Sequence, residues 1–169
     1  QTYLGMPQAR QSLNEARRLY QSKKIDNPEN IASAKVYLLS GTNDNTVLQR
    51  VTDVALETYR NWGVPHHSIQ YVNKLPVGHA FPTADYGNRC ETPSEPPFIS
   101  NCGRDIAGEI LNHLLGDLIP NGVMKRERVF IFNQFDPSET KDAVKAFMQM
   151  KGYAYIPEGC EYPEAAGCR

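Results

Sequence analysis

The sequence of 169 residues lacks the features of several common functional classes. Its 18 basic and 19 acidic side chains give a net charge of -1, so no basic surface for binding nucleic acid is expected. No apolar run approaches the roughly 18 residues of a membrane-spanning helix, so no segment is predicted to cross a membrane. Glycine-rich phosphate loops and dinucleotide-binding fingerprints are also missing. The composition is that of an ordinary globular protein, and the length suggests one domain or one large piece of a domain.

Cysteine is scarce, and the four cysteines fall in two close pairs. Cys90 and Cys102 form one pair, and Cys160 and Cys168 form the other, each in a loop rich in Pro, Gly, Glu or Asn. Proximity favours the disulfides Cys90–Cys102 and Cys160–Cys168, which would indicate an oxidising compartment. The alternative, a zinc site, needs cysteines spaced as in C-x2-C, and neither pair has that spacing.

The pattern of apolar residues predicts strands that alternate with helices. The expected strands span residues 35–40, 68–72, 128–133 and 153–156, and the expected helices span 7–20, 46–62, 104–115 and 136–150. Residues 73–102 are expected to form a long, proline-rich loop. This alternation predicts an α/β domain with a mainly parallel sheet, in which functional groups collect at the carboxyl ends of the strands.

Two chemically active residues follow consecutive predicted strands. Asp44 follows the strand at 35–40, and His79 follows Gly78 beyond the strand at 68–72. An acid and a histidine in this arrangement match the last two members of a Ser-His-Asp triad, as laid out in α/β hydrolases. The histidine would act as the general base, and the carboxylate would fix its tautomer and stabilise the imidazolium. Structural roles are the alternatives: a turn or helix cap for Asp44 and a packed loop residue for His79.

The serine that would complete such a triad is missing from the sequence. No G-x-S-x-G elbow occurs, and the Ser-Gly pair at Ser40 lacks the first glycine. Several other serines lie in turn contexts and are not predicted to be nucleophiles: Ser68, Ser94, Ser100 and Ser138. The adjacent His66 and His67 have no third ligand nearby, so an exposed turn is favoured over a metal site. Tyr86 and Phe98, in the long loop, either line a site or cover it.

The segments around Asp44 and His79 resemble those of extracellular polyhydroxyalkanoate (polyhydroxybutyrate) depolymerases. Residues 36–47, VYLLSGTNDNTV, are similar to their acid-bearing segment, and residues 78–87, GHAFPTADYG, are similar to their histidine-bearing segment. Residues 152–157, GYAYIP, together with Cys160 and Cys168-Arg169, resemble the segment that leads to the oxyanion strand. The resemblance covers nearly the whole chain from about Ile25.

The order of these segments resembles that of the circularly permuted depolymerases, in which serine, acid and histidine come first and the oxyanion region last. The resemblance therefore implies that residues 1–169 are a single partial catalytic domain, part of an α/β-hydrolase sandwich in circularly permuted order. The nucleophile segment is expected upstream of Gln1 and the oxyanion segment beyond Arg169. Because Gln1 is neither an initiating Met nor the start of a secretory signal, we expect a processed or trimmed chain.

The resemblance further implies a secreted serine esterase that hydrolyses short-chain polyhydroxyalkanoate, with Asp44 and His79 as catalytic residues and no cofactor or metal. The expected partners are a hydrophobic polyester or oligoester substrate and the remainder of the chain's own catalytic domain, but no nucleic acid and no membrane. The isolated chain is expected to be inactive because it lacks the serine. The alternatives are a related feruloyl or acetyl-xylan-type esterase and a non-catalytic polymer-binding fragment.

Overall fold

The computed structural model describes residues 8–116, 118, 124–135 and 149–161, which lie in two compact units, residues 1–118 and 119–169. That residues 1–169 form one partial domain stays a prediction. The first unit contains α1 (Ala9–Gln21), η1 (Pro28–Ser33), β1 (Val36–Leu39), α2 (Gln49–Asn61), η2 (His66–Ser68), β2 (Ile69–Val72), β3 (Phe81–Thr83), β4 (Asn88–Arg89), β5 (Ile99–Asn101) and α3 (Ile106–Leu115). The second contains η3 (Arg126–Arg128), β6 (Val129–Asn133) and β7 (Lys151–Tyr155).

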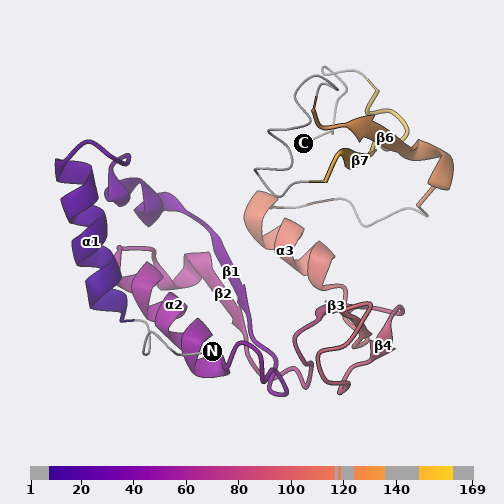
Figure 1. The fold of residues 1–169 in the computed structure, drawn as a ribbon, viewed down its shortest axis with the longest axis horizontal. Coiled ribbons are helices and arrows are strands. Elements are labelled where there is room, and N and C mark those ends of the chain that lie inside the picture. Colours follow the sequence, from indigo (N-terminus) through magenta and orange to yellow (C-terminus); the bar gives the residue numbers. More distant parts are fainter. Residues whose placement is uncertain (1–7, 117, 119–123, 136–148, 162–169) are drawn as a thin grey trace. The chain divides into compact units, whose positions relative to one another are not determined.

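The centre of the first unit is the parallel pair β1–β2. The two strands pair in register from Val36 opposite Ile69 to Leu39 opposite Val72. Helices α1 and α2 lie on one side of this pair, and α3 lies on the other (Figure 1). The apolar run of β1 is explained by this arrangement, because a strand covered by helices on both faces needs apolar side chains on both. The predicted α/β layering with parallel strands is thereby confirmed for this unit.

Helix α3 is attached to β1 by polar contacts as well as by packing. The Asp105 carboxylate caps its start by accepting the Gly108 N–H at 2.9 Å. The Tyr37 hydroxyl of β1 donates to Glu109 Oε2 at 2.9 Å, and Arg104 pairs with the same carboxylate. Burial, together with the bond to Glu109, raises the pKa of Tyr37 to about 12. At the start of the helix, Ile106 is only 1% exposed.

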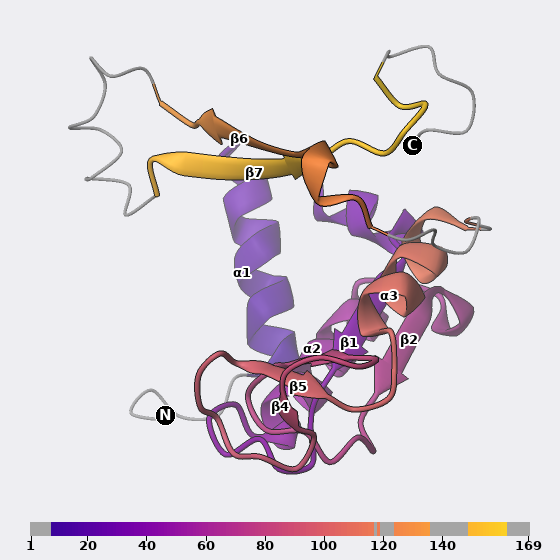
Figure 2. The ribbon, with the colours of Figure 1, turned by 90° about the vertical axis from the view of Figure 1, so that its right-hand side faces the viewer.

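The region predicted as one long loop, residues 73–102, contains three short parallel strands in the order β3–β5–β4. This small sheet lies beside the loops that follow β1 and β2 (Figures 1 and 2). Cys90 follows β4 and Cys102 follows β5, and their predicted disulfide is present with a Cα–Cα distance of 4.7 Å. The prediction of a loop was wrong because strands of two or three residues carry too little pattern to read from a sequence.

The second unit contains a different kind of strand pair. Strands β6 and β7 pair antiparallel, from Val129 opposite Tyr155 to Asn133 opposite Lys151. All residues of β6 are exposed, although its apolar run predicted a buried strand. Two strands alone leave both faces of the pair open, so the apolar run is not matched by burial within the described residues. The helix predicted at 136–150 lies almost entirely outside the described residues. Cys160 is disulfide-bonded, and its expected partner, Cys168, also lies outside them.

The helix predicted at 46–62 begins later, at Gln49, and ends at Asn61. It starts late because the main-chain N–H groups of Thr46 and Val47 donate to the Asp44 side chain and form a turn before the helix. Within the part of the chain that the structure describes, no helix is long and apolar enough to cross a membrane.

The burial of Ile106 generates a prediction about stability. Ile106→Ala is expected to lower the free energy of unfolding by about 2–5 kcal/mol, because it leaves a cavity at a fully enclosed site. Urea denaturation of the variant and the wild type measures this difference.

The matched control is Leu111→Ala, on the same helix at a side chain that is 47% exposed. It is expected to cost far less than the Ile106 variant. Equal losses for the two variants would contradict the packing described for α3.

Candidate active site

The loops that follow β1 and β2 run side by side, because main-chain pairing continues beyond the ends of the strands. The Ser40 N–H donates to the Val72 carbonyl at 2.9 Å, Thr42 N–H to Leu75 at 2.8 Å, and Asn43 N–H to Val77 at 3.2 Å. These bonds hold the acid loop, residues 40–47, against the histidine loop, residues 73–80. Asp44 and His79 come just after the last of these bonds, which joins Asn43 to Val77.

Gly41 allows the two loops to approach this closely. A Cβ atom at Gly41 would lie 1.9 Å from the Val77 carbonyl oxygen, so any other residue would force the loops apart. Val77 itself is fully buried at this crossing. Glycine is therefore required at position 41 because the two main-chain segments lie so close together.

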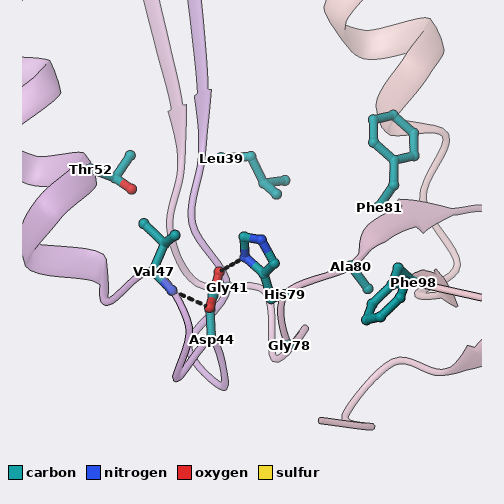
Figure 3. Close-up of a pocket in the computed structure, with 10 residues that line it drawn as sticks. All are labelled: Leu39, Gly41, Asp44, Val47, Thr52, Gly78, His79, Ala80, Phe81 and Phe98. Carbon is teal, nitrogen blue, oxygen red and sulfur yellow. Dashed lines mark hydrogen bonds and ion pairs between the residues drawn. The ribbon is translucent and has the colours of Figure 1, made fainter. Parts of the chain in front are cut away.

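Asp44 and His79 contact each other directly. His79 Nδ1 lies 2.9 Å from Asp44 Oδ2, and Figure 3 shows the carboxylate and the ring pointing toward one another. The Asp44 side chain is 10% exposed, whereas the His79 side chain is 49% exposed. The pair therefore has a buried acid end and an imidazole that faces open space.

The other oxygen of Asp44 is held by the main chain. Asp44 Oδ1 accepts the N–H of Val47 at 2.8 Å and of Thr46 at 2.9 Å. Burial on its own would raise the pKa of Asp44, but the bond to His79 and these two N–H donors outweigh burial and lower that pKa below its usual value. Because an ionised carboxylate only accepts hydrogen bonds, the tautomer that fits this contact carries its proton on Nδ1 and has Nε2 as its acceptor atom.

A pocket of about 590 Å³ adjoins the pair. The residues around it are Leu39, Gly41, Asp44, Val47, Thr52, Gly78, His79, Ala80, Phe81 and Phe98 (Figure 3). Phe81 and Phe98 are 46% and 50% exposed, so this pocket has apolar walls that are accessible from solvent. Such a pocket combines one polar pair with mostly apolar surroundings, as small-molecule sites do.

The other side chains singled out in the sequence are not part of this pair. His66 and His67 lie exposed on η2, and no group of residues that could hold a metal ion occurs among the described residues. Ser40 and Ser100 are buried at 3% and 1% exposure, which does not suit a nucleophile. Of the two aromatic residues in the long loop, Phe98 lines the pocket and Tyr86 does not.

Three contributors to the site were not predicted from the sequence. Thr46 and Val47 supply N–H donors to Asp44, and Ser94 accepts the main-chain N–H of His79 at 3.0 Å. An acidic residue followed closely by Thr and Val is compatible with a side-chain turn, so the first two could have been found from local sequence. No comparable signal points to Ser94, because it reaches His79 only through the folding of the small sheet.

The lowered pKa of Asp44 predicts how stability depends on pH. A carboxyl group with a depressed pKa in the folded state contributes stability above its unfolded pKa of about 3.9. That contribution is lost as the pH falls from this value through the lower pKa of the folded state. Asp44→Asn should therefore flatten the acid decline in the free energy of unfolding, measured by urea denaturation between about pH 5 and pH 2. Parallel pH curves for the variant and the wild type would show that the Asp44 contacts do not favour its ionised form.

Polyhydroxybutyrate depolymerases are similar in sequence to this chain. No family model matches the chain. It is 37% identical over 147 residues to a poly(3-hydroxybutyrate) depolymerase of Delftia acidovorans, covering 86% of this chain and 28% of that protein. It is 28% identical over 145 residues to a polyhydroxybutyrate depolymerase of Talaromyces funiculosus, covering 83% of this chain and 41% of that protein. The chain thus spans less than half the length of either relative.

Two solved structures share the fold. One is a crystal structure of a PHB depolymerase from Penicillium funiculosum, with a TM-score of 0.72 at 24% identity, covering 94% of this chain and 48% of that chain. The other is a PHB depolymerase variant in complex with an R3HB trimer, with a TM-score of 0.73 at 24% identity, covering 96% of this chain and 50% of that chain. The resemblance to polyhydroxybutyrate depolymerases is therefore confirmed, and the chain has part of their α/β-hydrolase fold.

Proposed function

We propose that this chain carries the acid and the base of a serine esterase, and that the whole protein hydrolyses ester bonds of short-chain polyhydroxyalkanoate. The observation that carries the proposal is the 2.9 Å contact between Asp44 and His79 at the rim of an apolar pocket. The similarity to polyhydroxybutyrate depolymerases supports the same reaction. The chain spans only part of those relatives, so the activity of the whole protein is itself part of the proposal.

The proposed reaction uses a serine that this sequence does not supply in an elbow motif. The serine hydroxyl attacks the ester carbonyl while Nε2 of His79 accepts its proton. The tetrahedral intermediate then expels the alkoxide, which takes the proton back from His79, and an acyl-serine remains. His79 then takes a proton from water, and the hydroxide attacks the acyl-serine. The serine oxygen leaves and takes that proton from His79, so the acid is released and the serine is regenerated.

Asp44 has two roles in this proposal. Its hydrogen bond to Nδ1 holds the ring in the tautomer that leaves Nε2 available, and its negative charge stabilises the imidazolium formed when the serine is deprotonated. The lowered pKa of Asp44 supports both roles, because the carboxylate then stays ionised at neutral pH. No step of this reaction needs a cofactor.

The pocket supports an apolar ester as substrate. Its walls include Leu39, Phe81 and Phe98, which suit the methyl and methylene groups of a polyester better than a charged ligand. The solved complex of a PHB depolymerase with an R3HB trimer supports an oligoester as the bound form. The Cys90–Cys102 disulfide supports secretion into an oxidising environment, and we propose an extracellular location on that basis.

Loss of the proposed base should abolish hydrolysis in the full-length gene product. His79→Ala is expected to lower kcat by about 10⁴-fold or more, since the serine then has no proton acceptor. The measurement is release of 3-hydroxybutyrate from polyhydroxybutyrate granules. The matched control is His67→Ala, an exposed histidine on η2, which should keep wild-type activity.

Retention of activity in the His79 variant would contradict the proposed catalytic role. The same assay with feruloyl and acetyl-xylan substrates tests the substrate class. Faster release of ferulate or acetate than of 3-hydroxybutyrate would contradict the polyester assignment and favour a related esterase.

The isolated chain of 169 residues should not hydrolyse a short-chain p-nitrophenyl ester, because a triad without its serine loses several orders of magnitude in rate. The measurement is release of p-nitrophenol above the rate in buffer. Turnover that a serine-reactive phosphonate blocks would contradict this expectation and would place the nucleophile within the chain.

A further inference from the structure

We propose that Ser94 is a positioning residue that fixes the main chain of His79 and so aligns its ring with Asp44. This inference rests on the proposed function only in taking His79 to be the base. The Ser94 hydroxyl accepts the main-chain N–H of His79 at 3.0 Å, although the two residues are 15 positions apart. It also lies 3.3 Å from the Thr46 hydroxyl, which belongs to the acid loop.

These contacts close a ring of four hydrogen bonds. Asp44 Oδ2 meets the His79 ring, the His79 N–H meets Ser94, the Ser94 and Thr46 hydroxyls meet each other, and the Thr46 N–H returns to Asp44 Oδ1. Each member of the ring is held from two sides. A closed ring of this kind restricts the acid and the base together, since moving either one breaks a bond on the other side.

The loop that carries Ser94 is itself braced. It lies between Cys90 and Cys102, and their disulfide closes it. A Cβ atom at Gly78 would lie 2.7 Å from the Thr92 carbonyl oxygen, so this loop packs directly against the residue before His79. The Asn43 side chain also donates to the Glu91 carbonyl at 3.4 Å. The loop therefore contacts the acid loop and the histidine loop at once.

The need for such a brace follows from the exposure of His79. Half of its side chain is exposed within this chain, so packing by residues of this chain contributes little to holding the ring. Asp44 restrains only the Nδ1 side, and the ring can leave it through a shift of the main chain. The bond from His79 N–H to Ser94 opposes that shift. Ser94 acts here through its contact with the His79 main chain, which distinguishes this role from that of a nucleophile.

The test uses the full-length gene product and the variant Ser94→Ala, with two readouts. One is the low-field proton NMR signal of the His79 Nδ1–H bonded to Asp44, assigned by its loss in His79→Ala. The other is the steady-state rate with an oligoester. We expect the signal to move upfield and broaden. We expect kcat to fall about three- to tenfold, as for the loss of one hydrogen bond, with KM unchanged because Ser94 does not line the pocket.

Three further variants make the result specific. Ser94→Thr keeps the hydroxyl at an exposed position and should restore both the signal and kcat. Glu95→Ala is the matched control in the same loop, at an exposed side chain that makes none of these contacts, and should leave both readouts at wild-type values. Thr46→Val removes the other hydroxyl of the ring at nearly constant volume. It should shift the signal in the same direction, which keeps the proposal testable if Ser94→Ala does not fold.

An unchanged proton signal in Ser94→Ala would overturn the proposal, as would a loss of signal that Ser94→Thr does not restore. The signal is independent of the reaction. A signal that depends on Ser94 in a protein without esterase activity would uphold the positioning role of Ser94 and refute the proposed function.

Discussion

The site depends on main-chain pairing that continues past the ends of two parallel strands. Main-chain hydrogen bonds from Ser40, Thr42 and Asn43 to the segment that begins at Val72 bring the loops after β1 and β2 together. The contact between Asp44 and His79 depends on this pairing, because the two residues lie where the paired loops end. Gly41 is part of the same constraint, since a side chain there would separate the loops and with them Asp44 and His79.

The electrostatics of the pair follow from its position. Asp44 is nearly buried, which on its own disfavours a charge, yet two main-chain N–H groups and the imidazole keep the carboxylate ionised. These donors are fixed by the turn that precedes α2, so the environment of the carboxylate is set before any substrate arrives. A preorganised acid of this kind stabilises an imidazolium without rearranging as the charge forms. His79 also lines an apolar pocket, where the proposed attack on an ester group would take place.

The sequence predicted the parts of this molecule that have strong local patterns. The strands around Tyr37 and Tyr71, the helices packed on them, the Cys90–Cys102 disulfide and the contact between Asp44 and His79 all follow from apolar runs, loop chemistry or spacing. The short strands β3, β4 and β5 were missed because two or three residues are held by their neighbours rather than by their own propensity. Ser94 was missed for a related reason, since its contact with His79 depends on how the disulfide-closed loop folds. The apolar run of β6 predicted a buried strand, but burial depends on what packs against it.

The central claim is that Asp44 and His79 act as one unit toward a serine. The most direct measurement is a crystal structure of the full-length gene product after reaction with a serine-reactive phosphonate. The account predicts a phosphonylated serine within hydrogen-bond distance of His79 Nε2, with Nδ1 of the same ring still bonded to Asp44. A modified serine remote from His79, or an Asp44 carboxylate too far from the ring to share a proton, would contradict it.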